Sequence, residues 1–344
     1  MASAVIEQIR ANLSQKREGI VEWLRTTPQS RRQVRLGPAE EQALQAHLVA
    51  IDTALEKAAA ETLGTCTVCH ESVEDSLLEM DYTAEVCLDH LSSEEMRHLE
   101  FDLELAQSVQ KSLLPQQTPD VPGLEVAAFS RPAQILGGDY FDFFRFQDGI
   151  GGLAIADVAG HGLSAGLHMA GVQALLRTLV PVNAYPAEVV LHLQRLLIHN
   201  VRFSTFVTLF LGSFDQATRL LTYCNAGHNP PLLLRAQSRS GVDPLQWLEP
   251  TGAAIGLLEE SQYREESVRL EPGDILLLYT DGVTEASDEQ GKQFGQERLA
   301  EIVGRQAGRA VGDLVRAVRE EVLQFTQREA LADDATIVAC RVSG

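Results

Sequence analysis

The sequence predicts an α+β protein, in which a helical N-terminal region precedes a larger region of alternating strands and helices. Two observations support this prediction. From residue 4 to residue 63, apolar side chains recur every three or four positions, which is the period of an amphipathic helix. Beyond residue 122, apolar residues gather in short continuous runs that end in turn residues, a pattern typical of buried strands.

The composition narrows the possible functions. The 344 residues are enough for two or three domains, and 45% hydrophobic with 22% charged residues is typical of a globular protein. The formal net charge of −20 argues against nucleic acid or an anionic membrane surface as a partner, because both attract Lys and Arg. No apolar stretch approaches the roughly 20 residues of a membrane span, and the N-terminus lacks a signal-peptide core. We therefore expect a cytoplasmic protein that binds neither nucleic acid nor membrane.

The N-terminal region begins with two predicted helices. Apolar residues keep a helical spacing over residues 4–25 and again from about residue 39 to residue 63. The segment T-T-P-Q-S-R-R-Q-V-R-L-G-P between them is rich in turn-forming residues. Two helices joined by a short connection predict an antiparallel hairpin, although both could instead pack on the rest of the protein.

A cysteine–histidine pattern follows the second helix. Cys66, Cys69, Cys87 and His90 have the spacing C-x2-C-x17-C-x2-H, in which each pair can form one knuckle of a tetrahedral zinc site. Four protein ligands leave no open position, so we expect one structural Zn²⁺. His70 could replace His90, but its place directly after Cys69 would distort the knuckle. Clustered cysteines in a reducing compartment also favour metal over disulfides.

The hairpin, the run T-L-G-T-C-T-V-C and the knuckle spacing together resemble the DksA/TraR family of zinc-finger proteins over about residues 4–92. The resemblance implies a helical hairpin with a zinc finger, and we assign residues 1–91 to this regulatory module. His90 stands where the family usually has a fourth cysteine, a change that zinc tolerates. The predicted hairpin tip carries arginines where the transcription factors of the family carry acidic residues: Arg31, Arg32 and Arg35. The likeness therefore concerns the fold rather than regulation of RNA polymerase.

A third helix is predicted over residues 92–114. The segment S-S-E-E is an N-cap signature, and a series of prolines beginning at Pro115 ends the helix. Its apolar stripe has steps of four and three: Leu99, Leu103, Ala106, Gln110 and Leu113. This spacing suits a parallel two-helix seam or a stalk packed on the next domain. We define residues 92–118 as a linker helix and possible coiled coil.

Strands and helices then alternate along the chain. The predicted strands cover residues 124–130, 153–157, 206–214, 219–225, 231–235, 275–280 and 335–342, and the predicted helices cover residues 162–179, 187–200, 297–303 and 311–328. The sequence contains neither a phosphate-binding Gly-rich loop nor a dinucleotide-binding fingerprint.

Acidic residues stand at several predicted strand ends. Asp157 ends an apolar run, Asp139 follows a Gly pair, Asp281 ends I-L-L-L-Y-T-D, and Asp333 and Asp334 precede A-T-I-V-A. One such residue could be an ordinary turn Asp that binds local backbone, but four such places favour carboxylates that meet in space. Crowded carboxylates repel one another unless divalent cations lie between them. Two ions about 3.5–4 Å apart would lower the pKa of a shared water and hold a phosphoryl group.

Other residue types add little to this chemistry. No Ser or Cys stands in a nucleophile motif, so attack by metal-bound hydroxide is the simplest hypothesis. His161 in G-H-G and His228 in A-G-H-N-P-P could each be a general acid for the leaving group, or a turn residue.

Six segments in fixed order resemble the SpoIIE/RsbU group, the bacterial branch of metal-dependent Ser/Thr phosphatases of the protein phosphatase 2C type. They are I-L-G-G-D-Y-F-D-F-F, I-A-D-V-A-G-H-G-L-S-A, F-V-T-L-F-L-G, N-A-G-H-N-P-P-L-L-L-R, L-E-P-G-D-I-L-L-L-Y-T-D-G-V-T-E-A and D-D-A-T. The likeness covers about residues 101–344. It includes the segment L-E-L-A-Q-S-V-Q-K-S-L-L-P, which is similar to the regulatory linker helix of this group.

This resemblance implies an α-β-β-α sandwich phosphatase domain over residues 119–344, with two antiparallel sheets and two Mn²⁺ or Mg²⁺ ions at one end. The implied ligands and catalytic residues are Asp139, Asp157, the Val158 carbonyl, Asp281 and Asp333, with Asp334 as the alternative to Asp333. Asp157 would bridge both ions.

The implied activity is that of a protein-serine/threonine phosphatase in a partner-switching pathway. Its expected substrate is a phosphorylated anti-anti-sigma (STAS-type) protein. An unidentified regulator would act on the N-terminal module, and the linker helix would transmit the signal and form a homodimer. Two alternatives stay open: a non-enzymatic signalling scaffold or transcription modulator that uses the zinc-finger hairpin, and an enzyme that acts on small phosphoesters.

Overall fold

The computed structural model describes residues 4–26, 29–117, 121–160, 162–198, 206–236, 244–258, 260–327 and 331–344. The chain divides into two compact units, Met1–Asp102 and Leu103–Gly344. Within the described ranges, no helix is both long enough and apolar enough to cross a membrane.

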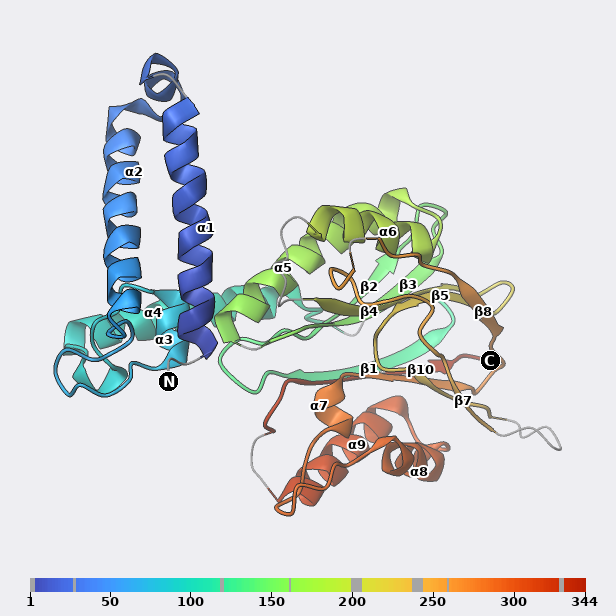
Figure 1. Cartoon of the computed structure of the whole chain (residues 1–344). Coiled ribbons are helices and arrows are strands. Elements are labelled where there is room, and N and C mark those ends of the chain that lie inside the picture. Colours follow the sequence, from blue (N-terminus) through green and yellow to red (C-terminus); the bar gives the residue numbers. More distant parts are fainter. Residues whose placement is uncertain are drawn as a thin grey trace. The chain divides into compact units, whose positions relative to one another are not determined.

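The N-terminal unit begins with a pair of antiparallel helices, α1 (Ala4–Thr26) and α2 (Gln29–Ala59) (Figure 1). Their facing side chains form a small core around Leu13, Ile51 and Ala54. Arg17 on α1 also forms an ion pair with Asp52 on α2, at 2.5 Å. Two short helices follow, α3 (Asp75–Met80) and η1 (Leu88–His90). The predicted pair of antiparallel helices is therefore present.

The second helix is longer than predicted. The sequence predicts a start near residue 39, but α2 begins at Gln29 and runs through Gly37 and Pro38. Proline costs a helix one N–H donor but holds φ near the helical value, and tertiary context can override such local breaker signals. The prediction that the turn-rich connection extends to Pro38 was therefore wrong. The arginines predicted at the hairpin tip have side chains outside the described set: Arg31, Arg32 and Arg35.

The linker helix α4 (Ser93–Leu113) begins with the predicted cap. The Ser92 N–H donates to the Glu95 carboxylate at 2.9 Å, and the Glu95 N–H donates to the Ser92 hydroxyl at 3.2 Å. The part of α4 from Leu103 onward belongs to the second unit, where Gln110 exchanges two hydrogen bonds with Gly137. Of the two predicted arrangements, this part of the helix therefore has the second, a stalk packed on the next domain.

The second unit contains two five-stranded sheets, and all of their strand pairings are antiparallel. The first sheet has the order β1 (Leu124–Arg131), β10 (Ala335–Val342), β9 (Ile275–Tyr279), β6 (Leu232–Leu234) and β7 (Leu245–Trp247). The second sheet has the order β2 (Tyr140–Arg145), β3 (Gly151–Val158), β4 (Val207–Asp215), β5 (Leu220–Ala226) and β8 (Glu266–Arg269).

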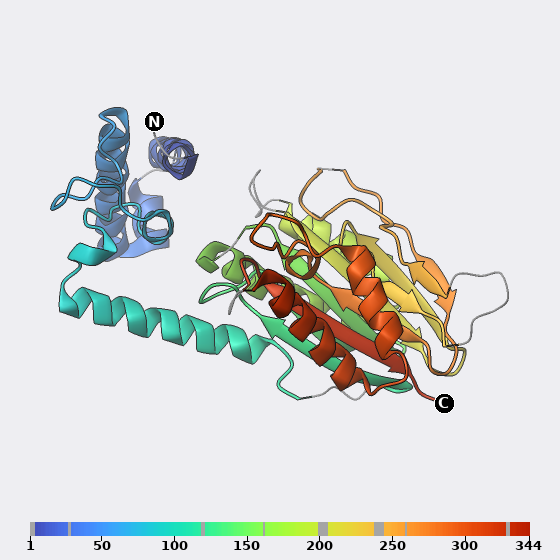
Figure 2. The same ribbon diagram turned by 90° about the horizontal axis from the view of Figure 1, so that it is seen from below.

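Helices cover the outer face of each sheet (Figures 1 and 2). The helices on the second sheet are α5 (Gly162–Leu179) and α6 (Pro186–Leu197), with the short η2 (Val180–Val182) between them. The helices on the first sheet are α8 (Gln296–Gln306) and α9 (Val311–Thr326), and the short α7 (Asp281–Thr284) follows β9 directly. This unit is therefore the expected mixed fold with two antiparallel sheets, layered as an α-β-β-α sandwich.

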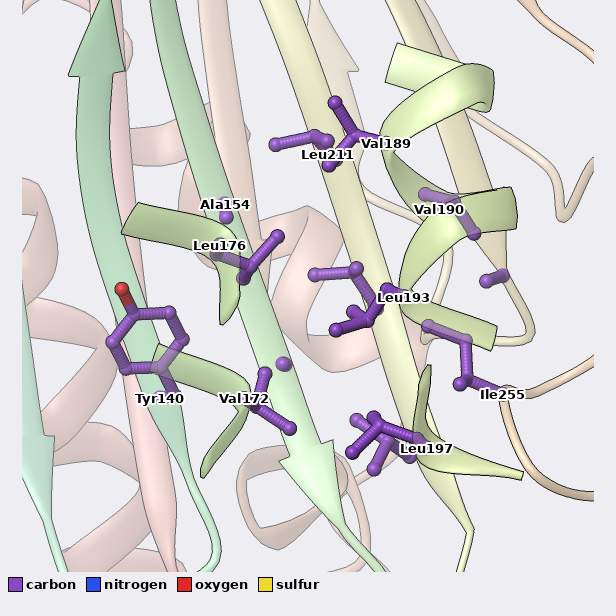
Figure 3. Close-up of a cluster of buried hydrophobic side chains, with 14 of the residues drawn as sticks. Tyr140, Ala154, Val172, Leu176, Val189, Val190, Leu193, Leu197, Leu211 and Ile255 are labelled. Atoms are coloured by element: carbon purple, nitrogen blue, oxygen red, sulfur yellow. The ribbon is translucent and has the colours of Figure 1, made fainter. Parts of the chain in front are cut away.

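Three apolar cores correspond to the three interfaces between these layers. The core between the second sheet and its helices includes Leu176 and Leu193 (Figure 3). The core between the first sheet and its helices includes Leu314, and the core between the two sheets includes Ile155 and Leu278. Because the central strands are buried on both faces, their sequences are continuous apolar runs rather than alternating ones.

The sequence does not predict the edge strands β7 and β8 or the interrupted strand β2. The edge strands β7 and β8 span three and four residues and fully bury none of their side chains, which weakens any periodic signal. In β2, the acidic residue Asp142 interrupts the apolar run Y-F-D-F-F. Asp142 is 1% exposed and accepts hydrogen bonds of 2.6 Å from Nε and from Nη2 of Arg177 on α5. An ion pair with a neighbouring helix therefore accounts for a carboxylate inside a strand.

Candidate active site

The predicted carboxylates lie at strand ends in both sheets. The second sheet carries Asp139, directly before β2, and Asp157, near the end of β3. The first sheet carries Asp281, which opens α7 after β9, and the pair Asp333 and Asp334 before β10. Residues nearly 200 positions apart in the chain are therefore presented by neighbouring strand ends.

Two threonine hydroxyls join the sheets at this end. Thr280 Oγ1 and Thr336 Oγ1 each donate a hydrogen bond to Asp139 Oδ2, at 2.8 and 2.7 Å. The Thr336 N–H in turn donates to Thr280 Oγ1 at 2.9 Å. The prediction from sequence missed both residues, although each stands beside a predicted ligand in Y-T-D-G or D-D-A-T. A hydroxyl next to a candidate carboxylate was the signal that could have identified them.

The pKa values of the carboxylates also indicate that these groups lie near one another. Burial, followed by the charges of Asp281, Asp333 and Asp334, raises the pKa of Asp157 to about 7. Burial and the charge of Asp157 hold the pKa of Asp139 well above its usual range. Burial and the charge of Asp333 raise the pKa of Asp281. Mutual repulsion of this kind requires that the charged groups lie near one another, as the strand-end pattern predicts.

The donor set fits hard divalent cations. Asp139 is 6% exposed, and its Oδ1 accepts no hydrogen bond from the described residues. Such an oxygen is costly to bury unless a proton or a cation meets it. Within the described part of the chain, no three of these carboxylates bring their oxygens within 4.8 Å of one another. Mg²⁺ usually takes one or two protein carboxylates and keeps several waters, so a magnesium site does not require three carboxylate oxygens within that distance.

The two neighbouring acidic residues before β10 have different surroundings. Asp334 is 5% exposed, and both of its oxygens accept main-chain hydrogen bonds, Oδ1 from Ala133 at 2.7 Å and Oδ2 from Gly138 at 2.6 Å. A Cβ on Gly137 would lie 2.6 Å from Asp334 Oδ2, so only glycine permits this approach. Asp333 is exposed, and its Oδ1 accepts only the N–H of Asp334 among the described contacts, at 2.8 Å. Asp334 is thus engaged in holding the loop before β2, whereas Asp333 has an oxygen available.

Of the two histidines suggested as general acids, the structure describes one. His161 lies outside the described residues. His228 is 1% exposed, and its Nδ1 lies 2.8 Å from Thr208 Oγ1. A ring buried to this extent does not meet a substrate, so the structure favours the alternative of a residue that fixes the turn after β5.

The N-terminal unit contains a second group of possible ligands. The donor atoms of Cys66, Cys69, Cys87 and His90 all lie within 4.8 Å of one another. Cys69 Sγ and Cys87 Sγ are 3.8 Å apart, the separation of about 3.8 Å expected for two sulfurs each about 2.3 Å from one tetrahedral Zn²⁺. Main-chain N–H groups, with that of Cys69 first, lower the pKa of Cys66 to about 6. His70 is exposed and is not part of this group, so the geometry favours His90 as the fourth member.

Sequence comparison identifies the family of the second unit. The profile of Stage II sporulation protein E (SpoIIE) matches residues 147–343, more than half of the chain. The chain belongs to the SpoIIE family. The region matched to SpoIIE contains Asp157, Asp281 and the Asp333–Asp334 pair, and Asp139 lies just before it.

Individual SpoIIE relatives agree with this assignment. The phosphoserine phosphatase RsbU of Bacillus subtilis (strain 168) is 29% identical over 71% of this chain and 71% of its own length. Protein IcfG of Synechocystis sp. is 28% identical over 69% of this chain, which spans only 41% of IcfG. The SiaA-PP2C domain of Pseudomonas aeruginosa has the same fold, with a TM-score of 0.63 and 22% identity over 72% of this chain and 98% of that domain.

A further solved structure, the RsbU and RsbW domains of Rv1364c from Mycobacterium tuberculosis, has a TM-score of 0.56. It is 30% identical and covers 65% of this chain and 61% of that one. Family and fold together assign this SpoIIE member to the protein-serine/threonine phosphatases.

The acidic cluster predicts how stability depends on pH when metal is absent. The pKa of Asp157 rises from 3.8 to about 7 on folding, so the folded state binds more protons between those values. The free energy of unfolding should therefore fall as pH rises from about 4 to about 7. Above that range, the stabilisation that comes from protonation of Asp157 in the folded state should be lost completely. Thermal unfolding in metal-depleted buffer measures this loss, which should be smaller in Asp157→Asn and unchanged in the exposed control Asp313→Asn. Identical pH profiles for all three proteins would contradict the prediction.

The cysteine–histidine group predicts bound zinc. The full chain should carry about one zinc per molecule, and Cys87→Ser should lose it because three ligands bind a structural ion far more weakly than four. Metal analysis after gel filtration measures the content. The control is Cys224→Ser, which changes a buried thiol on β5 outside the group and should retain the ion. Zinc retained at full occupancy by Cys87→Ser would exclude this site.

Proposed function

We propose that the chain is a metal-dependent phosphoprotein phosphatase that hydrolyses phosphoserine and phosphothreonine. The observation that carries this proposal is the buried, unpartnered Oδ1 of Asp139 within a cluster of mutually repelling carboxylates at the ends of both sheets. A cluster of this kind has little use in a protein that only binds a partner, because neutral residues would pack there at lower cost. Membership in the SpoIIE family points to the same activity.

The proposed ligands are Asp139, Asp157, the Val158 carbonyl, Asp281 and Asp333. Two Mn²⁺ or Mg²⁺ ions held there would lower the pKa of a bound water and neutralise charge on the phosphoryl group. Neighbouring side chains of the protein hold the proposed ligands in position. Thr280 and Thr336 fix Oδ2 of Asp139, which leaves Oδ1 directed away from them. Asp334 is assigned to the loop rather than to an ion, because its oxygens already accept two main-chain hydrogen bonds.

The proposed substrate is a phosphorylated STAS-type anti-anti-sigma protein in a partner-switching pathway. The relative named phosphoserine phosphatase RsbU and the structure that joins RsbU and RsbW domains in one protein support this substrate class. The N-terminal unit would receive the signal from an unidentified regulator.

A phosphate-release assay tests the proposal. Replacing Asp157 by Asn should lower Mn²⁺-dependent release from a phosphorylated STAS protein about a hundredfold or more, because several kcal/mol of transition-state stabilisation would be lost. The matched control is Asp313→Asn, which changes an exposed residue of α9 paired with Arg316 and should keep full activity. Retained activity in Asp157→Asn would exclude the metal-dependent mechanism. Release from small phosphoesters but from no phosphoprotein would favour the small-molecule alternative.

The linker helix is the proposed route of regulation and dimerisation. On one side, Gln110 donates to the Gly137 carbonyl at 2.8 Å and accepts from the Gly137 N–H at 3.1 Å, two residues before Asp139. Movement of α4 would therefore act on the loop that positions a proposed ligand. A different stripe of α4 is exposed and apolar, with four-residue spacing: Phe101 (63% exposed), Leu105 (54%) and Val109 (52%). This stripe, rather than the predicted one, is the proposed seam with the α4 of a second copy.

Changing the centre of this stripe tests both roles. Leu105→Glu should convert a dimer into a monomer in sedimentation velocity, because a carboxylate cannot be buried in an apolar seam. It should also change the rate of phosphate release by several-fold if dimerisation positions α4. Val182→Glu, at a comparably exposed apolar residue of η2, is the control and should change neither property. A wild-type protein that is monomeric at micromolar concentration would contradict the proposed dimer.

A further inference from the structure

A buried histidine lies between the two strand systems that present the acidic cluster. His228 belongs to the turn A-G-H-N-P-P after β5 and is 1% exposed. Its N–H donates to Asn225 Oδ1 at 2.8 Å. The preceding Gly227 has a φ of +68°, and a Cβ there would lie 2.7 Å from the Ala254 nitrogen. The backbone of this turn is therefore fixed, which gives the imidazole one position.

One edge of the imidazole contacts the second sheet. Nδ1 of His228 lies 2.8 Å from Thr208 Oγ1 on β4. In the register of β3 and β4, Thr208 is the direct partner of Asp157. His228 therefore contacts the side chain of Thr208, which stands directly opposite Asp157, the proposed bridging ligand.

The first sheet is the other neighbour of the ring. The main chain of Tyr279, the last residue of β9, lies close to the imidazole. Thr280, which donates to Asp139, and then Asp281 follow directly. The second ring nitrogen, Nε2, is buried and makes no hydrogen bond to a described residue. Burial lowers the pKa of His228 to about 3, so the ring is uncharged.

We infer that His228 is a positioning residue that sets the separation between the strand end carrying Asp157 and the strand end carrying Asp281. Asp157 and Asp281 are presented by different sheets, so the separation between them depends on a connection between those sheets. An uncharged ring enclosed between β4 and β9 supplies that connection without adding charge to the site. This inference rests on the proposed function, because it assigns His228 a role in forming the proposed two-ion site.

Metal binding by the full chain is the decisive measurement. The Kd for Mn²⁺ is obtained from the free-ion signal in electron paramagnetic resonance, with zinc left in place. Removing a group that supports metal ligands typically weakens binding 10- to 100-fold, and this is the expected effect of His228→Ala. His228→Asn places an amide near the position of Nδ1 and should recover most of the affinity through Thr208. His192→Asn, on α6, is the matched control and should bind Mn²⁺ as the wild type does.

A second variant keeps the inference testable if His228→Ala does not fold. Thr208→Val removes only the hydroxyl that contacts the ring, and it should weaken Mn²⁺ binding by itself. Melting temperatures separate a general loss of stability from a loss of metal affinity. Mn²⁺ binding at the wild-type Kd in both His228→Ala and Thr208→Val would overturn this inference and leave the phosphatase proposal intact. Wild-type protein that binds no Mn²⁺ would overturn both.

Discussion

Repulsion among buried and partly buried carboxylates is the constraint on which the proposed active site depends. Neighbouring negative charges and burial raise the pKa of Asp139, Asp157 and Asp281, so bringing these groups together costs free energy. The fold opposes this cost with neutral donors. Hydroxyls of Thr280 and Thr336 hold Asp139, and the Asp334 carboxylate, held by main-chain N–H groups, fixes the loop before β2. Apart from the Asp334 carboxylate, the groups that organise the proposed metal site are therefore uncharged.

The sandwich explains why such an arrangement is stable. Three apolar cores pack the layers, and each central strand is buried on both faces, so the strand ends are rigidly placed. The loop I-L-G-G-D also lies very close to the end of β3, because a Cβ on Gly138 would lie only 2.6 Å from the Val158 carbonyl oxygen. Close approach of backbone segments at this end leaves room for oxygen donors and little room for anything larger.

The two groups of ligands differ in how the chain assembles them. Cys66 and Cys69, like Cys87 and His90, are three positions apart, so each knuckle forms within one short turn and its spacing is visible in the sequence. The carboxylates of the second unit come from Asp139 to Asp333, and only the pairing of β2, β3, β9 and β10 brings them together. The strand-end pattern nevertheless selected these residues from the sequence, because a charge that ends an apolar run is unusual, and the structure places each of them at or beside the end of a strand.

The sequence by itself determined the elements whose patterns are local and long: α1, α4, α5, the central strands, the cysteine–histidine group and the acidic strand ends. It did not determine the start of α2, the edge strands β7 and β8, or the different surroundings of Asp333 and Asp334. It also left the places of Gln110 and His228 open, and the structure decided both. The physical reason is that periodicity and spacing record which side chains must be buried or charged. The partner that each buried polar group meets depends on contacts between distant segments, and these exist only in the folded chain.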